Sequence, residues 1–370
     1  MEAPFLDLKT PNRALKAEIM ACWEEILDTA HFVGGKYLDL FEQEFAKACS
    51  VKECIAVSSG TDALKLIFKA LELQSGHEVI TVPNTFIATT EAISQAGGTI
   101  KFVDIDPDTY TIDVSKIEAA ITSNTRGIVP VHLYGQMADM DPILDIAKRY
   151  DLWIVEDACQ AHLAEYKGRR AGSIGRAAAF SFYPGKNLGA CGEAGAITTH
   201  DRELAQKVRV LRDHGQARKY HHEYEGYNDR CDALQAAALT VKLNHVPQWN
   251  EMRRKNAQLY VDHLQQVAGI TLPVISKYCL PVFHLFVIQV DNRDRVMTEL
   301  DKRGVKTGLH YPIPLHLQKA YQHLKIPVGS FPVTEKCAPR LLSLPMYPEL
   351  TPAQISYVSD CLQEILGSSS

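Results

Sequence analysis

Short apolar runs alternate with amphipathic segments along most of the chain. Several of these runs are apolar throughout, which is typical of strands that are covered on both faces. A regular succession of strand and helix predicts an α/β fold with a mostly parallel sheet and helices on both sides. The predicted strands are Cys54–Val57, Glu78–Val82, Ile100–Asp104, Gly127–His132, Leu152–Val155, Ala177–Phe182 and Gly195–Thr198.

The pattern changes on either side of this region. Residues from Pro11 to Phe45 are predicted to be helical, with a break near His31-Phe-Val-Gly-Gly35. Beyond Trp249 the composition shifts, and a smaller C-terminal domain is expected to close over the binding site. The elements predicted there are a long helix, a half-buried antiparallel strand within Val282–Val290 (from His284, Phe286 and Ile288), a helix over Arg295–Arg303 and a final helix from Pro352. The sequence therefore predicts a large domain over residues 1–248 and a smaller α+β domain over residues 249–370.

Polar residues follow the predicted strands at the edge where open α/β sheets bind their ligands. Ser58-Ser-Gly-Thr-Asp62 comes directly after the first strand and opens a helix. Such a turn presents free N–H groups and hydroxyls that can bind a phosphate. Simple N-capping of the helix by Thr61 or Asp62 would explain the same residues. Both interpretations stay open at this point.

Two further strand ends carry candidate ligand contacts. Phe86 follows the second strand, where it can pack into the core or stack on a flat heteroaromatic ring. Glu156 and Asp157 follow the fifth, and because a bare buried carboxylate is costly, each must be paired, hydrated or functional. Asp157 facing a pyridine nitrogen would keep that nitrogen protonated, and Gln160 could hydrogen-bond a ring hydroxyl. The alternative for Asp157 is that it caps the following helix.

Lys186 lies in a turn that follows the sixth predicted strand and is surrounded in sequence by Gly185, Gly189, Gly192 and Gly195. A lysine enclosed there can be desolvated, which lowers its pKa as a Schiff-base lysine requires. A surface lysine in a glycine-rich turn is the alternative. In combination, the phosphate-binding turn, the aromatic residue, the strand-end aspartate and this lysine describe a pyridoxal phosphate pocket, with Ser181 as a second phosphate hydroxyl.

These residues resemble the motifs of the DegT/DnrJ/EryC1/StrS sugar aminotransferases, and the likeness runs from Phe5-Leu-Asp-Leu8 to Ser343-Leu-Pro-Met346. The motifs are Ser58-Ser-Gly-Thr-Asp-Ala-Leu64, Glu156-Asp-Ala-Cys-Gln-Ala161, Ser181-Phe-Tyr-Pro-Gly-Lys-Asn-Leu-Gly189 and Gly226-Tyr-Asn-Asp-Arg-Cys-Asp-Ala-Leu-Gln-Ala236. The resemblance implies the aspartate-aminotransferase-like fold of type I pyridoxal phosphate enzymes.

The resemblance also implies a role for each site residue. Lys186 bonds covalently to the cofactor and moves protons, and Asp157 pairs with the pyridine nitrogen. The other cofactor contacts implied are Gln160 on the ring hydroxyl, Phe86 on the ring face, and Gly60, Thr61 and Ser181 on the phosphate. Asn228 reaches the phosphate from the neighbouring subunit, which implies a homodimer with shared active sites.

Two stretches are similar to the subgroup that aminates C-3 of a nucleotide-linked 3-keto sugar, His214-Gly-Gln-Ala-Arg-Lys-Tyr-His-His222 and His310-Tyr-Pro-Ile-Pro-Leu-His316. The resemblance implies a UDP- or dTDP-linked keto sugar as substrate and L-glutamate as amino donor, in amino sugar biosynthesis for lipopolysaccharide or another glycoconjugate. The residues expected to bind substrate are Tyr183, Arg230, Tyr311 and His316. On their own, His221, His222 and His316 would be taken as ordinary polar loop residues.

Charge and cysteine content indicate which binding partners and which cellular compartment to expect. The net charge of -5 and the dispersed basic residues give no reason to expect nucleic acid or a membrane surface as a partner. The nine cysteines form no C-x-x-C pair, no metal site is evident, and no secretory signal or membrane span is seen, so a reducing cytoplasm is expected.

Three other functions are set beside the leading one. A C-4 aminotransferase of the same family differs in regiochemistry, which only the resemblance decides. The family's dehydratases carry histidine where Lys186 stands, which argues against them. A non-catalytic regulatory protein on the same fold is the alternative from another class.

Overall fold

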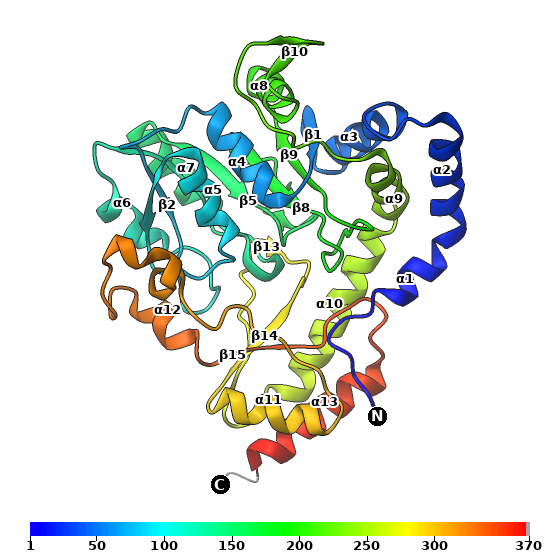
Figure 1. The fold of residues 1–370 in the computed structure, drawn as a ribbon. Helices are drawn as coiled ribbons and strands as arrows, with labels where there is room; N and C mark the ends of the chain where they lie inside the picture. The colour runs from blue at the N-terminus through cyan, green and yellow to red at the C-terminus, as the bar shows by residue number, and fades with distance from the viewer. Residues whose placement is uncertain (368–370) are drawn as a thin grey trace.

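A seven-stranded sheet forms the centre of the larger part of the molecule (Figure 1). In the computed structural model, which describes residues 1–367, every neighbouring pair in this sheet is parallel except the two pairs that involve β9. The predicted mostly parallel sheet is therefore confirmed. The strands, in spatial order, are β1 (Glu53–Val57), β9 (Gly195–Thr199), β8 (Ala177–Ser181), β5 (Trp153–Asp157), β4 (Thr125–Ile128), β2 (Glu78–Thr81) and β3 (Thr99–Phe102).

Both faces of this sheet are covered by helices, which explains why its strands are apolar throughout. Side chains alternate between the faces, so that Ile154 joins one hydrophobic cluster and Val155 the other. Helices α4, α5 and α8 contribute to the cluster with Val155, and α3, α7 and α9 to the cluster with Ile154. These helices are α3 (Lys36–Ala48), α4 (Gly60–Ala70), α5 (Ala88–Ala96), α7 (Met140–Tyr150), α8 (Arg202–Arg212) and α9 (Ala233–Leu243).

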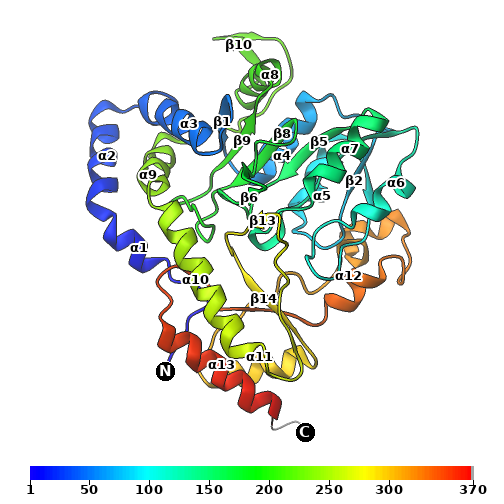
Figure 2. The ribbon, with the colours of Figure 1, turned by 180° about the vertical axis from the view of Figure 1, so that it is seen from behind.

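A second, three-stranded antiparallel sheet carries the C-terminal part, in the order β12-β14-β15. Its helices α10, α11 and α13 lie together at the end of the molecule near the N-terminus (Figure 2). None of the helices within residues 1–367 has the length and apolar character that crossing a lipid bilayer requires. The elements are α10 (Val246–Leu264), β12 (Ile270–Thr271), β14 (Phe286–Val290), α11 (Arg293–Lys302), β15 (Leu341–Leu344) and α13 (Pro352–Gly367).

The prediction of a half-buried strand is wrong for β14, because all five of its residues are buried. Phe286 and Ile288 pack among the C-terminal helices, while Val287 joins the core of the large sheet. Gln289 faces the same way as Val287 and donates a hydrogen bond of 2.9 Å to the Tyr110 hydroxyl. The strand is thus held between the two parts of the molecule and has no face left for solvent.

Chain segments cross between the two parts, and the predicted boundary at residue 248 stays a prediction. Ala3 pairs with Val305 of the C-terminal part. In the other direction, Thr334 donates hydrogen bonds to Asp104, at the end of the large sheet. The predicted C-terminal domain includes residues 368–370, which lie outside the described residues.

The remaining elements are short or peripheral. The helices expected between Pro11 and Phe45 are present, with the break between α2 and α3 at Ala30–Gly35. They are α1 (Lys9–Ala14), α2 (Lys16–Thr29), α6 (Ile117–Ala120), α12 (Pro332–Cys337), β6 (Glu165–Tyr166), β7 (Arg169–Arg170), β10 (Gln216–Arg218), β11 (His221–His222), β13 (Cys279–Leu280), and the 3-10 helices η1 (Val114–Lys116), η2 (Leu133–Gly135), η3 (Leu315–Leu317) and η4 (Lys319–Leu324).

Candidate active site

A cavity of about 740 Å³ lies beyond the carboxyl ends of the parallel strands, between the large sheet and the C-terminal part. Its walls combine segments that are far apart in sequence, from Phe5 and Leu6 near the N-terminus to His310 and Met346. Most of the sequence-predicted residues meet here, and they are Gly60, Thr61, Phe86, Asp157, Gln160, Ser181, Tyr183, Lys186 and Tyr311.

The start of α4 offers free N–H groups to this cavity. Ser59 is the N-cap, and its hydroxyl accepts a hydrogen bond of 3.1 Å from the Asp62 N–H. The cap is therefore neither Thr61 nor Asp62. The backbone N–H groups of Gly60 and Thr61 have no partner among residues 1–367, as expected for the first turn of a helix.

Gly60 also lets α4 approach β8 closely. A Cβ atom at this position would lie 2.7 Å from the Cβ atom of Ser181 and 3.0 Å from the Cys159 sulfur. Contacts below 3.0 Å between such carbons are not tolerated without movement of the backbone, so a glycine is required here. The free N–H groups and the Ser181 hydroxyl are brought together by this approach.

Asp157 and Glu156 point to opposite faces of β5, as strand geometry requires. Asp157 lies on the cavity side, where its Oδ2 accepts a 2.7 Å hydrogen bond from the Thr89 hydroxyl of α5. Its Oδ1 accepts a 3.2 Å hydrogen bond from the N–H of Cys159. These two donors fix the carboxylate at the cavity wall, and no helix begins directly after it for Asp157 to cap.

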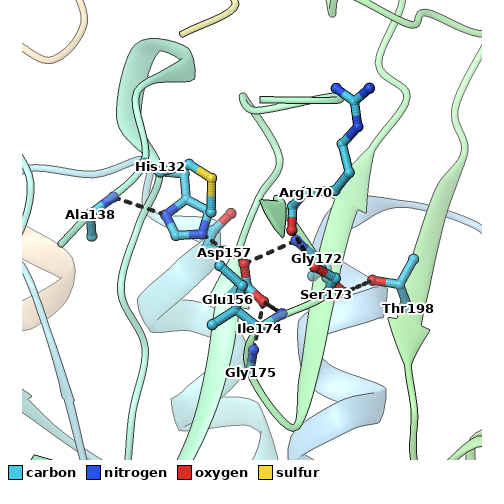
Figure 3. Close-up of polar contacts among 12 residues, drawn as sticks. His132, Ala138, Glu156, Asp157, Arg170, Gly172, Ser173, Ile174, Gly175 and Thr198 are labelled. Atoms are coloured by element: carbon cyan, nitrogen blue, oxygen red, sulfur yellow. Dashed lines mark hydrogen bonds and ion pairs between the residues drawn. The ribbon is translucent and has the colours of Figure 1, made fainter. Parts of the chain in front are cut away.

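Glu156 is held by a buried network on the other face (Figure 3). Its oxygens accept hydrogen bonds of 2.7 to 2.9 Å from the N–H groups of Gly172, Ile174 and Gly175, and from His132 Nε2. The Ala138 N–H donates to His132 Nδ1, so Nε2 carries the proton of a neutral ring. Burial acts to raise the pKa of Glu156, but these donors lower it on balance. Of the two acids, Glu156 is the structural one.

We expect Glu156→Gln to destabilise the fold by about 2–4 kcal/mol, because its amide would set N–H groups against the donors Gly172 and His132. Since the pKa of Glu156 is lowered, this contribution is present above the pKa of the unfolded carboxyl group and is lost as pH falls through the folded value. Thermal unfolding of the variant at neutral and acidic pH measures both effects. Glu118→Gln, in an exposed ion pair with Arg149, is the control and should leave the unfolding midpoint close to that of the wild type. An unfolding midpoint for Glu156→Gln equal to that of the control would contradict the assignment.

Lys186 enters the cavity from the loop after β8. Its backbone N–H donates to the Tyr183 carbonyl at 2.8 Å, which closes the turn. Its amine makes no hydrogen bond or ion pair within the described part of the chain. Burial lowers the pKa of this amine, although the Cys159 thiol and the Asp157 carboxylate act in the opposite direction. A partly desolvated, unpaired lysine is suited to act as a nucleophile and as a base.

Aromatic and amide side chains complete the wall. The Gln160 amide accepts from the Tyr134 N–H at 2.7 Å and donates to the Tyr311 hydroxyl at 3.1 Å. The Phe86 ring lies 5.8 Å from the Tyr311 ring, centroid to centroid, and its side chain is 54% exposed. An aromatic face is thus available at the mouth of the cavity for a flat ligand.

Three of the sequence-predicted residues do not line the cavity of this chain. Asn228 is exposed, and its main chain pairs with Asp213. The Arg230 guanidinium forms an ion pair with the same Asp213. His316 is 3% exposed, with its Nε2 3.0 Å from Glu335 Oε1 and its ring against Phe331. His316 is thus buried against Phe331 and does not line the cavity of its own chain, and its assignment to substrate binding stays a prediction.

The cavity residues that were not predicted from the sequence include Thr89, Glu193, His284 and His310. Thr89 carried a usable signal, since it lies one helical turn beyond Thr85 and their hydroxyls are 2.9 Å apart. His284 was assigned to a strand that begins only at Phe286, so it lies in the approach to β14.

Comparisons with known proteins show which family this chain belongs to. The sequence profile of the DegT/DnrJ/EryC1/StrS aminotransferase family matches residues 13–363. The chain belongs to this family. A Streptomyces venezuelae relative, named dTDP-3-amino-3,4,6-trideoxy-alpha-D-glucose transaminase, is 45% identical over 361 residues, which cover 98% of this chain and 95% of the relative. A Geobacillus stearothermophilus relative, named pleiotropic regulatory protein, is 43% identical over 366 residues, 98% of each chain.

Solved structures of family members share the whole fold. The crystal structure of S. venezuelae DesV, in complex with a ketimine intermediate, matches with a TM-score of 0.96 at 44% identity and covers 98% of each chain. The structure of NtdA from Bacillus subtilis with bound cofactor PMP matches with a TM-score of 0.92 at 36% identity, over 99% of this chain and 85% of that one. The predicted type I fold is confirmed, and pyridoxal phosphate is the cofactor of this aminotransferase family.

The residues of this cavity fit that cofactor. The two unpartnered N–H groups at the start of α4 match a phosphate group, and the unpaired amine of Lys186 matches an aldehyde carbon. Asp157 supplies a fixed carboxylate in the same cavity. No basic side chain is needed to hold the phosphate when helix N–H groups and a hydroxyl are present.

Proposed function

We propose that this enzyme transfers the amino group of L-glutamate to C-3 of a nucleotide-linked 3-keto sugar. The observation that carries the proposal is one cavity that brings together the unpaired amine of Lys186, the carboxylate of Asp157 and the free N–H groups of α4. The S. venezuelae relative is named as a transaminase of a dTDP-linked 3-amino sugar. This name supports a nucleotide-linked sugar as the substrate and C-3 as the position that is aminated.

Each residue has a distinct task in this proposal. When bound, pyridoxal phosphate supplies an electron sink and carries the amino group from donor to acceptor. Gly60, Thr61 and Ser181 bind the phosphate, Asp157 holds a proton at the ring nitrogen, and Phe86 covers the ring face. Gln160 orients the ring hydroxyl together with Tyr311, to which it is hydrogen-bonded.

Lys186 moves the protons. Its amine takes the proton from the α-carbon of glutamate, whose amino group passes to the cofactor and whose carbon skeleton takes up the oxygen of one water and leaves as 2-oxoglutarate. In the second half reaction the amine gives a proton to C-3 of the sugar, whose carbonyl oxygen leaves as one water, so that no water is gained or lost over the cycle. The lowered pKa of Lys186 favours a neutral amine that can start this cycle. Tyr183, 55% exposed at the mouth of the cavity, contacts the sugar.

We also infer a homodimer with shared sites. Asn228 is exposed and does not reach the cavity of its own chain, as expected for a residue that completes the phosphate site of a partner. Arg230 lies on the same segment and serves the substrate of that partner. Exposed apolar side chains at Leu27, Phe32 and Val33 support a protein interface on that side of the chain.

The nine thiols are free, which supports a reducing cytoplasm as the setting.

The product is an amino sugar building block for a glycoconjugate such as lipopolysaccharide.

A regulatory function is the second candidate, because the G. stearothermophilus relative is named a pleiotropic regulatory protein. Amino-group exchange distinguishes the two. A regulatory protein on this fold need not exchange amino groups with any donor, whereas an enzyme must do so.

The test is the absorbance spectrum of the purified protein before and after addition of L-glutamate. We expect a visible band of the lysine-bound cofactor to give way to a near-ultraviolet band of its amino form. The glutamate-treated protein is then mixed with 3-keto and 4-keto sugars linked to UDP or dTDP. If the visible band returns with 3-keto sugars and not with 4-keto sugars, the proposal is supported. If it returns with 4-keto sugars and not with 3-keto sugars, the assignment of C-3 as the aminated position is overturned. A protein that binds no pyridoxal phosphate overturns the function.

A further inference from the structure

Two buried amides lie behind Lys186, and main-chain carbonyls fix the orientation of both. The Asn250 amide donates to the His162 carbonyl at 2.9 Å, so its oxygen must point the other way. The Asn187 amide donates to that oxygen at 2.8 Å and to the Val282 carbonyl at 2.9 Å. Because a carbonyl only accepts, turning either amide around would oppose two oxygens.

This arrangement fixes the tautomer of His284. With both of its N–H bonds used, Asn187 has only its oxygen Oδ1 to offer, and His284 Nδ1 lies 3.2 Å from it. Nδ1 must therefore be the protonated nitrogen of His284. In a neutral ring the other nitrogen, Nε2, is then left with a free lone pair.

The ring of His284 is held neutral by its surroundings. Burial lowers its pKa well below the ordinary value, and the positive charges of Lys186 and Arg253 and the neighbouring rings of His310 and His162 act in the same direction. Arg253 lies directly behind it, donating to the His284 carbonyl at 3.3 Å. A second proton on this ring would thus be strongly disfavoured.

His284 and Lys186 share the wall of the cavity, and Asn187 connects them as the chain neighbour of Lys186 and the hydrogen-bond partner of His284. His284 Nε2 makes no hydrogen bond with the residues that the structure describes, and it is not among their fully buried unpartnered atoms. The Lys186 amine is likewise without a partner in the described part of the chain. A fixed acceptor and an unpaired donor therefore line the same cavity.

We propose that His284 is a positioning residue for Lys186, with Nε2 accepting a hydrogen bond from the Lys186 amine whenever that amine is not bonded to the cofactor. This inference rests on the proposed transamination. It gives His284 a role in that reaction, together with the amides of Asn187 and Asn250 that orient it. A neutral acceptor orients the amine with little competition for its proton, because burial and the charges of Lys186 and Arg253 disfavour a second proton on His284. Lys186 therefore keeps the proton that the sugar carbon needs.

The tautomer can be measured without any activity. In full-length protein labelled with 15N-histidine, ring-nitrogen NMR distinguishes protonated from unprotonated nitrogens, and His284→Asn identifies the signal by its disappearance. We expect a neutral ring with a proton on Nδ1 and none on Nε2, both with the cofactor bound and after its removal. A ring protonated at Nε2 would overturn the proposal.

Kinetics of two matched variants test the positioning role. His284→Asn keeps an N–H where Nδ1 lies but has no acceptor at the place of Nε2, whereas His284→Gln can place an amide oxygen there. We expect kcat to fall on the order of 10²-fold in His284→Asn, the lower end for a positioned proton-transfer partner. The KM for the sugar should stay within about twofold, since only proton transfer is affected, and His284→Gln should recover much of the loss.

His323→Asn, at an exposed histidine of η4, is the control and should behave as wild type. His284→Asn with wild-type kcat, or equal losses in His284→Asn and His284→Gln, would overturn the positioning role while transamination by the wild type stands. A wild-type protein that exchanges no amino group overturns the proposed function, and the proposal for His284 with it.

Discussion

Lys186→Ala is expected to lose at least about 10⁴-fold in turnover, the upper end of what one positioned proton-transfer group contributes. Among the described residues that line the cavity, Lys186 is the one that carries an amine. The nearest imidazoles cannot replace it as bases. Burial, with a smaller contribution from the charge of Lys186, lowers the pKa of His310 to about 4, and burial also lowers the pKa of His284 well below its ordinary value. Burial is the largest cause at both histidines and remains in the variant. Single-turnover reaction with L-glutamate, followed by absorbance, measures the loss.

The variant should fold normally, because the Lys186 amine makes no hydrogen bond within residues 1–367 that the fold depends on. Its thermal midpoint should therefore match that of the wild type. Added methylamine is expected to restore part of the rate in Lys186→Ala, since a small amine can enter the space left by the side chain. Undiminished turnover in Lys186→Ala would contradict the assignment of Lys186 as the proton-transfer residue.

Much of the cavity was predictable because the strand ends were visible in the sequence. An apolar run such as Trp153–Val155 predicts a covered strand, and the polar residue that follows it is then placed at the ligand-binding edge. That reasoning reached Lys186 and the acidic pair Glu156 and Asp157. It could not say which of Glu156 and Asp157 faces the cavity until the alternation of β5 was set by the packing of Ile154 and Val155 on opposite faces.

The positions of the remaining site residues depend on contacts between segments far apart in sequence, which no local sequence pattern predicts. Tyr311, in the loop before η3, lines the cavity, whereas His316, five residues further on within η3, is buried beside Phe331. His284 gains its chemistry from Asn187 and Asn250, which are distant from it in sequence and are oriented by main-chain carbonyls. The prediction for β14 failed for the same reason, since Tyr110, in the loop that follows β3, contacts the face that was expected to meet solvent.

Asp157→Asn should lower the rate of the glutamate half reaction on the order of 10³-fold, equivalent to about 4 kcal/mol of barrier. The Cys159 N–H needs an acceptor, so the asparagine oxygen should stay at the place of Oδ1 and the NH₂ group should replace Oδ2. The Thr89 hydroxyl can turn to accept from that group, because the Thr85 hydroxyl is a second partner 2.9 Å away. The fold is thus preserved while the residue loses its ability to hold a proton at the ring nitrogen.

Thr89→Val is the matched control for this variant. It removes the hydroxyl that donates to Asp157 Oδ2 but leaves the carboxylate and its bond to the Cys159 N–H in place. We expect a loss of about tenfold, the lower end for one hydrogen bond to a charged group, because the carboxylate itself stays in place. Titration of pyridoxal phosphate into both variants separates weaker cofactor binding from slower chemistry. An Asp157→Asn enzyme that is saturated with cofactor and still reacts at the wild-type rate would show that the electron sink does not depend on this carboxylate, and Asp157 would then be a residue that only shapes the cavity wall.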